Sequence, residues 1–192
     1  MTAEWVTAIS TAFTALVIAA SAIAALLQIR HLRRGNEIEI IQKWTEVMES
    51  SEFGSARAFV AGDLPRILSE PERVAALSWN PFPPELQPVR TVSNHFEAVG
   101  AFIKLRSIED RVACELWGLV VLECWRAAAP VIQLLREKYR SDALWENFEY
   151  LAVLADRWFA EHPQGTYPAN ARRMEPDRSL AIALEAATRD WQ

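Results

Sequence analysis

Residues 5–29 contain no formally charged side chain, and this run constrains the fold more than any other feature of the chain. The hydrocarbon core of a bilayer is about 30 Å thick and a helix rises about 1.5 Å per residue, so about 20 apolar residues can cross it. The run is long enough and predicts a membrane-spanning helix, with the lipid bilayer as its first partner. The side chains expected at the two membrane interfaces are Trp5, Arg30, Arg33 and Arg34.

The charges that flank this run decide between an anchor and a cleaved secretory signal. Ala22-Ile23-Ala24 resembles a cleavage site, but a signal peptide carries positive charge before its apolar core. Here Glu4 precedes the run and the basic cluster follows it. We therefore predict that residues 1–34 are a transmembrane anchor with a basic cytoplasmic edge. The positive-inside rule then places the N-terminus outside and the rest of the chain in the cytoplasm.

The anchor is rich in small residues, several of which are four positions apart. Small side chains let a second helix approach closely within a membrane, so self-association of the anchor is one expectation. The alternative is that an alanine-rich anchor spans the bilayer as a single helix. The residues concerned are Ala8, Thr11, Ala12, Ala15, Ala19, Ser21, Ala22 and Ala25.

The composition beyond the anchor is that of one soluble helical domain. The whole chain holds eight Trp and eight Phe but only six Gly, which favours a well-filled aromatic core with few flexible joints. All 20 Lys and Arg and all but one of the 25 acidic residues lie beyond Ile29, so this part is mildly acidic. A broad basic surface that could neutralise phosphates is missing, and we expect no nucleic acid partner.

Apolar residues recur at three- and four-residue steps through residues 35–161 and predict an all-α, bundle-like cytoplasmic domain. The first helix of this domain could continue directly from the anchor, and Gly35 is the expected place for an interruption between them. Pro71 is expected in the first turn of a short helix that runs through Leu77. Residues 162–192 are expected to form a loop and a C-terminal amphipathic helix.

Prolines mark two places where regular structure should change. Four of them fall within residues 79–88, too many for a helix or strand, so this stretch is expected to be an extended connection packed on the domain. A proline-rich ligand for a partner's aromatic groove is the other interpretation. Pro130 is expected to break or kink a helix, and Ser141 or Asp142 to cap the helix that follows.

The best concentration of polar residues comprises Asn94, His95, Glu97 and Glu149. His95 could act as a general base if a carboxylate oriented it. Residues one or two apart do not face each other on a helix, so His95 and Glu97 cannot form that pair alone and Glu149 would have to come from another helix. The alternative is a structural network, in which the polar pair joins two helices or binds the backbone amides of a turn.

The sequence lacks the spacings that carry known chemistry. Cys-x-x-Cys, His-x-x-x-His and Glu-x-x-His are absent, as are nucleotide-binding glycine loops and a nucleophile elbow. Cys114 and Cys124 are ten residues apart on one predicted helix, about 15 Å along its axis and beyond disulfide reach. We expect no metal and no cofactor, and no catalytic residue is assigned.

Several short segments have a recognisable order and spacing: Phe53, Ala56-Arg57 and Phe59, Asn94 to Gly100, Glu123 to Arg126 with Pro130, and Phe148 to Leu151. They resemble a bacterial family of uncharacterised single-anchor membrane proteins. This resemblance spans about residues 5–160. It implies an N-terminal membrane helix followed by a helical domain with an Asn-x-Phe-Glu segment, and hence the bacterial inner membrane as the location. It implies no activity, because the family has no assigned role.

Together these features favour a membrane-anchored interaction module, an adaptor, scaffold or regulator that binds another protein or itself. The C-terminal helix is the candidate contact, because Leu180, Leu184 and Trp191 lie on one face after a long loop. The alternative for this helix is packing against its own domain. The alternative function is a membrane-bound enzyme or small-ligand sensor that uses the four polar residues above.

Overall fold

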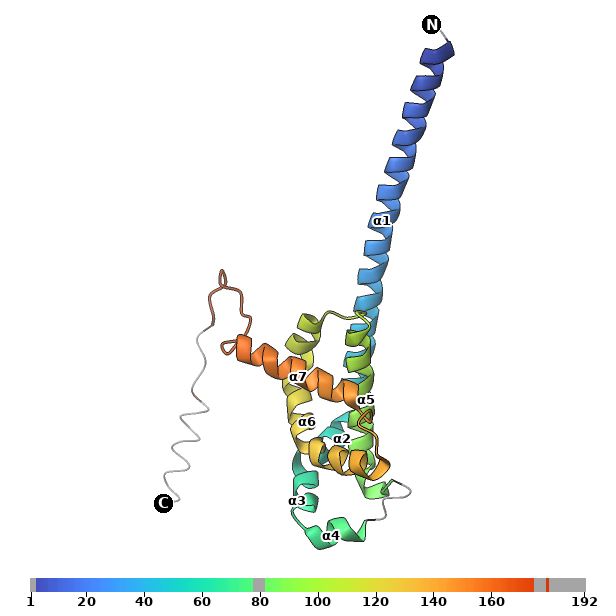
Figure 1. Cartoon of the computed structure of the whole chain (residues 1–192). Helices are drawn as coiled ribbons and strands as arrows, with labels where there is room; N and C mark the ends of the chain where they lie inside the picture. The colour runs from blue at the N-terminus through green and yellow to red at the C-terminus, as the bar shows by residue number, and fades with distance from the viewer. Residues whose placement is uncertain (1–2, 78–81, 175–178, 180–192) are drawn as a thin grey trace. The chain divides into compact units, whose positions relative to one another are not determined.

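The computed structural model describes residues 3–77, 82–174 and 179 of the chain (Figure 1). Residues 1–161 form one unit and residues 162–192 a second. Within the described ranges every regular element is helical and no strand occurs, so the predicted all-helical class is confirmed for this part of the chain. In the second unit, the guanidinium of Arg173 lies 4.7 Å from the centroid of the Tyr167 ring.

Helix α1 (Ala3–Glu49) is a single helix that joins the apolar run to the domain. Figure 1 shows it running from the N-terminus into the group formed by α2, α5, α6 and α7. Of the two expectations, a helix continuing directly from the anchor is the one observed, and no interruption occurs at Gly35: one glycine inside a helix costs only about 1 kcal/mol, and 32 α-helical residues precede it. By length and composition α1 could cross a membrane, and none of its most apolar stretch is buried.

Short helical segments follow α1. Helix α2 (Ser51–Ala58) begins after Ser50, whose hydroxyl accepts the Phe53 N–H at 3.2 Å as an N-cap. A π-helical turn η1 (Phe59–Asp63) and α3 (Leu64–Leu68) continue directly from it. Helix α4 (Pro71–Ala76) begins with Pro71, as predicted. Proline lacks a backbone N–H, but the N–H groups of the first helical turn have no partner within the helix, so nothing is lost there.

The proline-rich connection is shorter than predicted. Residues 78–81 lie outside the described ranges, but a 3-10 turn η2 (Pro84–Leu86) and helix α5 (Gln87–Lys104) already include Pro84 and Pro88. Proline fits at these positions because its fixed φ suits the first helical turn. The extended stretch therefore ends before Pro84, so the prediction for its last residues was wrong.

Two longer helices complete the first unit. Helix α6 (Asp110–Tyr139) continues through Pro130, so the chain does not break there, and Figure 1 shows the helix bending along its length. Helix α6 also has the length and composition of a membrane span, but it carries buried core residues such as Val121 and Leu135. Helix α7 (Glu146–Glu161) starts four residues or more after Ser141 and Asp142, which is too far along the chain for either residue to be its N-cap. The prediction of that cap was wrong.

The core lies where α7 packs across α5 and α6 and where α2 packs on α5. Phe96 and Phe148 stack with ring centroids 5.2 Å apart, and the edge of Trp125 meets Phe148 at 5.1 Å. Burying each such side chain contributes about 1.5–3 kcal/mol, so aromatic packing holds α5, α6 and α7 together. The largest fully buried side chains are Phe53, Phe96, Phe148, Leu64, Leu86, Ile132, Leu135 and Leu151.

Gly100 sets the distance between α5 and the start of α7. A Cβ atom placed on Gly100 would lie 2.0 Å from the carbonyl oxygen of Asn147 and 2.6 Å from its carbonyl carbon. Any other residue would push these two backbones apart. This close approach brings the polar side chains of α5 within hydrogen-bonding distance of the first residues of α7.

Candidate functional site

Glu97 caps α7 from a neighbouring helix. Its Oε2 accepts the backbone N–H groups of Asn147 and Phe148, both at 3.0 Å, and its Oε1 accepts the Asn147 side-chain amide at 2.7 Å. The first N–H groups of a helix have no partner within it and carry partial positive charge, so a carboxylate stabilises them. Glu97 of α5 therefore acts as the N-terminal cap of α7.

Asn94, which lies about one turn before Glu97 on α5, holds the turn that leads into α7. Its Oδ1 accepts the indole N–H of Trp145 at 2.8 Å. Trp145 has a φ of 54°, a left-handed conformation that side chains other than glycine adopt only when their surroundings hold them there. The hydrogen bond and the burial of the indole provide that support.

Glu149 belongs to a different contact, with Arg136 of α6. Glu149 Oε2 lies 2.6 Å from Arg136 Nη1, and Arg136 Nε donates to the carbonyl oxygen of Leu144 at 2.9 Å. The Arg136 side chain is only 9% exposed, whereas that of Glu149 is 45% exposed. This ion pair therefore balances a buried charge at the end of α6 and ties the turn before α7 to that end.

His95 lies among aromatic rings and meets none of the other three candidates. Its ring centroid is 4.8 Å from that of Trp44 in α1, 4.6 Å from Phe53 in α2 and 5.2 Å from Phe96. Burial lowers the pKa of His95 from 6.5 to about 4. The imidazole is thus neutral at pH 7, and Nε2 has no hydrogen-bond partner in the described part of the chain.

The four predicted polar residues therefore serve three separate purposes. Asn94 and Glu97 hold the start of α7, Glu149 pairs with Arg136, and His95 packs where α1, α2 and α5 meet. Their side chains do not converge on a common pocket. The arrangement corresponds to the structural network that the sequence offered as the alternative, including the binding of backbone amides.

The two cysteines are buried thiols, as the sequence predicted. Burial raises the pKa of Cys114 to about 11 and that of Cys124 to about 12, so both stay protonated at neutral pH. Among the described residues no group of three or more His, Cys, Asp and Glu is placed to bind a metal ion.

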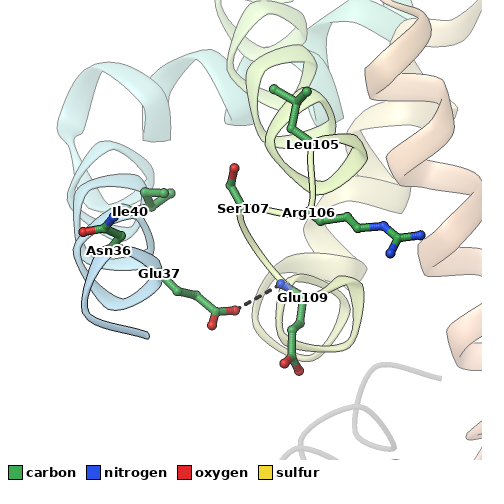
Figure 2. A pocket seen from close by; sticks show the side chains of 7 residues that line it. All are labelled: Asn36, Glu37, Ile40, Leu105, Arg106, Ser107 and Glu109. Atoms are coloured by element: carbon green, nitrogen blue, oxygen red, sulfur yellow. Dashed lines mark hydrogen bonds between the residues drawn. The ribbon is translucent and has the colours of Figure 1, made fainter. Parts of the chain in front are cut away.

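One open hollow of about 630 Å³ lies between the lower part of α1 and the turn that joins α5 to α6 (Figure 2). Glu37 crosses the edge of this hollow, where its Oε1 accepts the backbone N–H of Glu109 at 3.1 Å. Glu37 thus contacts the residue before α6 much as Glu97 contacts the start of α7. In the turn, Leu105 is 74% exposed and Arg106 has a φ of 57°.

A second open hollow of about 540 Å³ lies along the same helix and shares Asn36 and Ile40 with the first. Sequence analysis missed both hollows, because the first combines α1 with the turn after α5 and the second combines α1 with Phe102 near the end of α5. The spacing of the α1 residues is the sequence signal that could have indicated the second one. Its lining residues are Asn36, Glu39, Ile40, Lys43, Trp44, Val47 and Phe102.

The residues predicted to contact membrane and partner fall partly outside the described ranges. Trp5 is 67% exposed and Arg30 is also exposed on α1. Nothing is described of the Arg33 and Arg34 side chains, although their backbone lies in the helix. The predicted contact residues Leu180, Leu184 and Trp191 lie outside the described residues.

Comparison with known families gives one match. Residues 15–158 match the family described as "Domain of unknown function (DUF4760)", which is three quarters of the chain. The chain belongs to the DUF4760 family. No curated protein and no solved structure matches it.

The extent of the DUF4760 match fits the structure. The match begins within the apolar run of α1 and ends near the end of α7, so it contains both hollows and the Glu97 cap. It leaves out the C-terminal segment from residue 159 onward. The expectation of a helical domain of unknown function is therefore confirmed. The match also includes residues 15–49 of α1, a helix that the sequence analysis divided between an anchor and a domain.

Proposed function

We propose that this DUF4760 protein is a single-pass membrane protein whose helical domain binds another protein, or a second copy of itself, as an adaptor, scaffold or regulator. The observation that carries the proposal is the exposure and the unbroken course of α1. Its apolar part is exposed along its whole length, while the same unbroken helix ends among buried aromatic side chains. An exposed apolar surface of this length needs a hydrophobic solvent, and a bilayer supplies it.

The charges around the apolar run support the proposed orientation. Arg30, Arg33 and Arg34 follow the run and Glu4 precedes it, so the positive-inside rule favours a cytoplasmic domain and an external N-terminus. The inner membrane of a bacterium is the proposed location, on the family resemblance stated for the sequence. Arginine side chains here would also contact anionic head groups, each contributing about 1 kcal/mol.

Binding has more support than catalysis. Asn94 and Glu97 hold the start of α7, Glu149 pairs with Arg136, and His95 is a buried neutral ring. A general base needs access to the proton that it removes, which burial among rings denies to His95. The hollows beside α1 are instead open and partly apolar, which suits a protein surface.

The experiment that tests the proposal is crosslinking in intact cells, then affinity purification and mass spectrometry. The native chain is compared with a variant whose residues 5–29 are replaced by an unrelated spanning helix of equal length, which keeps α1 in phase with the domain. We expect a stoichiometric partner, either another protein or a second copy, with the native chain. A partner that both chains retain would assign binding to the cytoplasmic domain.

Two results would contradict the proposal. The native chain could be recovered as a monomer with no stoichiometric partner, which would remove the interaction role. Alternatively, cysteines placed in exposed turns of the domain could react with a membrane-impermeant maleimide in intact spheroplasts as readily as after lysis. That result would overturn the cytoplasmic orientation.

A further inference from the structure

The turn that joins α5 to α6 exposes a leucine more fully than any other large apolar side chain in the described part of residues 3–161. Leu105 is 74% exposed, compared with 68% for Phe13 in the apolar run of α1. A single exposed leucine is common on a protein surface. What Leu105 contacts therefore depends on its neighbours and on where the fold places it.

Arg106 ends α5 in a left-handed conformation, with a φ of 57°. Its N–H donates to the carbonyl oxygen of Ile103 at 2.8 Å, and the N–H of Ser107 donates to that of Phe102 at 2.9 Å. These two bonds form a Schellman motif, in which the left-handed residue is usually glycine. The motif leaves the side chains of Leu105 and Arg106 exposed at the end of the helix.

The same motif ends α6, so local capping accounts for the arginine in both places. Residues 138–141 repeat residues 104–107 with one change, in which Tyr139 replaces the leucine. Arg140 has a φ of 51°, and basic residues at a helix C-terminus offset its partial negative charge. The two turns differ in position. Helix α6 has 30 residues, so about 45 Å of helix separates them.

The α5–α6 turn lies at the end of the domain nearest to the apolar run of α1 (Figure 1). The Oε1 of Glu37 accepts the N–H of Glu109 at 3.1 Å, which holds the turn close to the level of Glu37. Glu37 comes eight residues after Ile29, the last residue of the run, and thus about 12 Å further along the helix. The head-group layer extends about 5–8 Å beyond the hydrocarbon core. An upright α1 would therefore leave only a few ångströms between the head groups and the turn.

The length of the apolar run favours a tilt that closes this gap. As a helix, residues 5–29 are about 38 Å long, whereas the hydrocarbon core is about 30 Å thick. A helix whose apolar stretch exceeds the core tilts, and contacts at the interface decide the direction of the tilt. A tilt toward the α5–α6 turn would bring Leu105 and Arg106 to the head groups.

We propose that the α5–α6 turn is a second membrane contact, in which Leu105 enters the head-group region and Arg106 binds anionic phospholipid head groups. This contact rests on the proposed function, because it requires α1 in the bilayer and the domain on the cytoplasmic side. Apolar side chains next to bases bind such a surface by burial and by charge together. Attachment at two points would fix the angle between the domain and the bilayer.

The ion pairs around the turn leave Arg106 available for an anion. Lys104 pairs with Glu146 at 3.1 Å. Arg111 pairs with Glu115 at 3.4 Å. The guanidinium of Arg106 has no partner within the described residues, and Figure 2 shows it extending away from α1. A phosphate or phosphoglycerol head group would supply the missing counter-charge.

The acidic residues near the turn are held by the protein itself. The Oδ1 of Asp110 accepts the N–H of Arg111 at 2.8 Å, and Glu37 accepts that of Glu109. Glu109 and Asp110 also lie at the N-terminus of α6, where the partial positive charge of a helix favours carboxylates. Together with Arg106, the three arginines that follow the apolar run give this end of the domain a basic edge suited to an anionic leaflet.

Fluorescent labelling of the full chain in lipid nanodiscs tests the contact. Leu105→Cys and the matched control Tyr139→Cys place a polarity-sensitive dye at the same position of the two turns, and both native cysteines are buried. The discs contain equal parts of phosphatidylglycerol and phosphatidylcholine. We expect the dye at position 105 to emit at shorter wavelength than the dye at position 139, to be shielded from aqueous iodide and to be quenched by nitroxide-labelled lipid.

A third label separates this contact from the anchor. Ile18→Cys places the dye within the apolar run, where the nitroxide-labelled lipid should quench it. If that dye is quenched but iodide reaches position 105 as readily as position 139, the second contact is overturned and the anchor stands. If iodide reaches the dye at position 18, the anchor is overturned and the second contact with it.

Arg106→Gln tests the part played by anionic head groups. In the labelled Leu105→Cys chain, the ratio of shielded to accessible dye should fall about fivefold with this change. Arg140→Gln, at the matching position of the other turn, should leave the ratio unchanged. Discs of phosphatidylcholine alone should lower it as Arg106→Gln does. An unchanged ratio in Arg106→Gln, or equal shielding in the two kinds of disc, would contradict the binding of anionic head groups.

Discussion

Glu97 and Asn147 lie 50 residues apart in the chain and are joined by two hydrogen bonds, one to the backbone N–H at 3.0 Å and one to the side-chain amide at 2.7 Å. With the bond to the Phe148 N–H, the carboxylate holds the first turn of α7. The cap is thus tertiary, and α7 can form its first turn fully only when α5 is beside it.

Removing this cap should lower stability. In Glu97→Gln the neutral amide accepts more weakly and presents a donor where an acceptor is needed, so we expect a loss of about 2 kcal/mol in the free energy of unfolding. Chemical denaturation of the purified full chain in detergent measures it. Glu146→Gln, an exposed change in the same turn, should cost less than about 0.5 kcal/mol. Equal losses in the two variants would exclude a cap.

Gly100→Ala should be among the most damaging small substitutions. The added methyl group would meet the Asn147 backbone at 2.0 Å, and neither helix can yield without losing the Glu97 hydrogen bonds. We expect a loss of about 3 kcal/mol, read from the denaturation midpoint. Gly54→Ala, where nothing lies within 4 Å, should instead raise stability by about 0.5–1 kcal/mol. A neutral Gly100→Ala would contradict the close approach of α5 and α7.

His95 should make stability depend on pH. Its pKa is about 4 in the folded chain and 6.5 when unfolded, so below pH 6.5 the unfolded state binds more protons. Stability is complete above pH 6.5 and falls as the pH drops toward 4, by up to about 1.4 kcal/mol per pH unit for this group. The difference between the native chain and His95→Phe, measured from pH 7 to pH 4, isolates the effect. A difference that does not change with pH would refute it.

The ion pair of Arg136 and Glu149 should be worth more than those on the surface. Glu149→Gln leaves a buried guanidinium without its counter-charge, and we expect a loss of about 2 kcal/mol. Asp156→Asn breaks the pair with Arg126, in which both side chains are 70% exposed, and should change stability by less than about 0.5 kcal/mol. Similar losses from the two variants would mean that burial does not strengthen the first pair.

The C-terminal contact remains a sequence-based prediction and has a direct test. Deleting residues 170–192 removes Leu180, Leu184 and Trp191 and leaves the DUF4760 match complete. We expect weaker capture of the partner in cells, with the stability of residues 1–161 unchanged. If partner capture and assembly size both stay the same, the contact should be assigned to the domain or the anchor.

Much of the fold could be predicted because its signals are local. The apolar run, the helical spacing of the core residues and the proline that starts α4 all act within a few neighbouring positions. The errors have two physical reasons. A glycine within a helix or a proline in its first turn interrupts it less than expected, and elsewhere a tertiary contact replaced a local signal. Ser141 and Asp142 looked like caps, but the cap comes from Glu97. At Pro130 the sequence predicted a break or a kink, and α6 continues across it without a break.

The sequence singled out four polar residues but could not indicate which partners each of them contacts. The sequence indicated that His95 and Glu97 could not face each other, and the structure places His95 against Trp44 and Phe53. Which residue on another helix meets Glu97 depends on the packing of α5 and α7, which no local pattern encodes. The hollows beside α1 were missed for the same reason.

The unbroken course of α1 gives the protein a mechanical property. Ala3 and Glu49 belong to one helix, so in the proposed membrane arrangement a rotation of the anchor or a change of its depth in the bilayer would be passed on to Glu37 and Trp44. A shift of one residue along the helix is a turn of about 100° and a displacement of about 1.5 Å. In that arrangement, bilayer thickness and torsion within the membrane would act on the aromatic packing around His95.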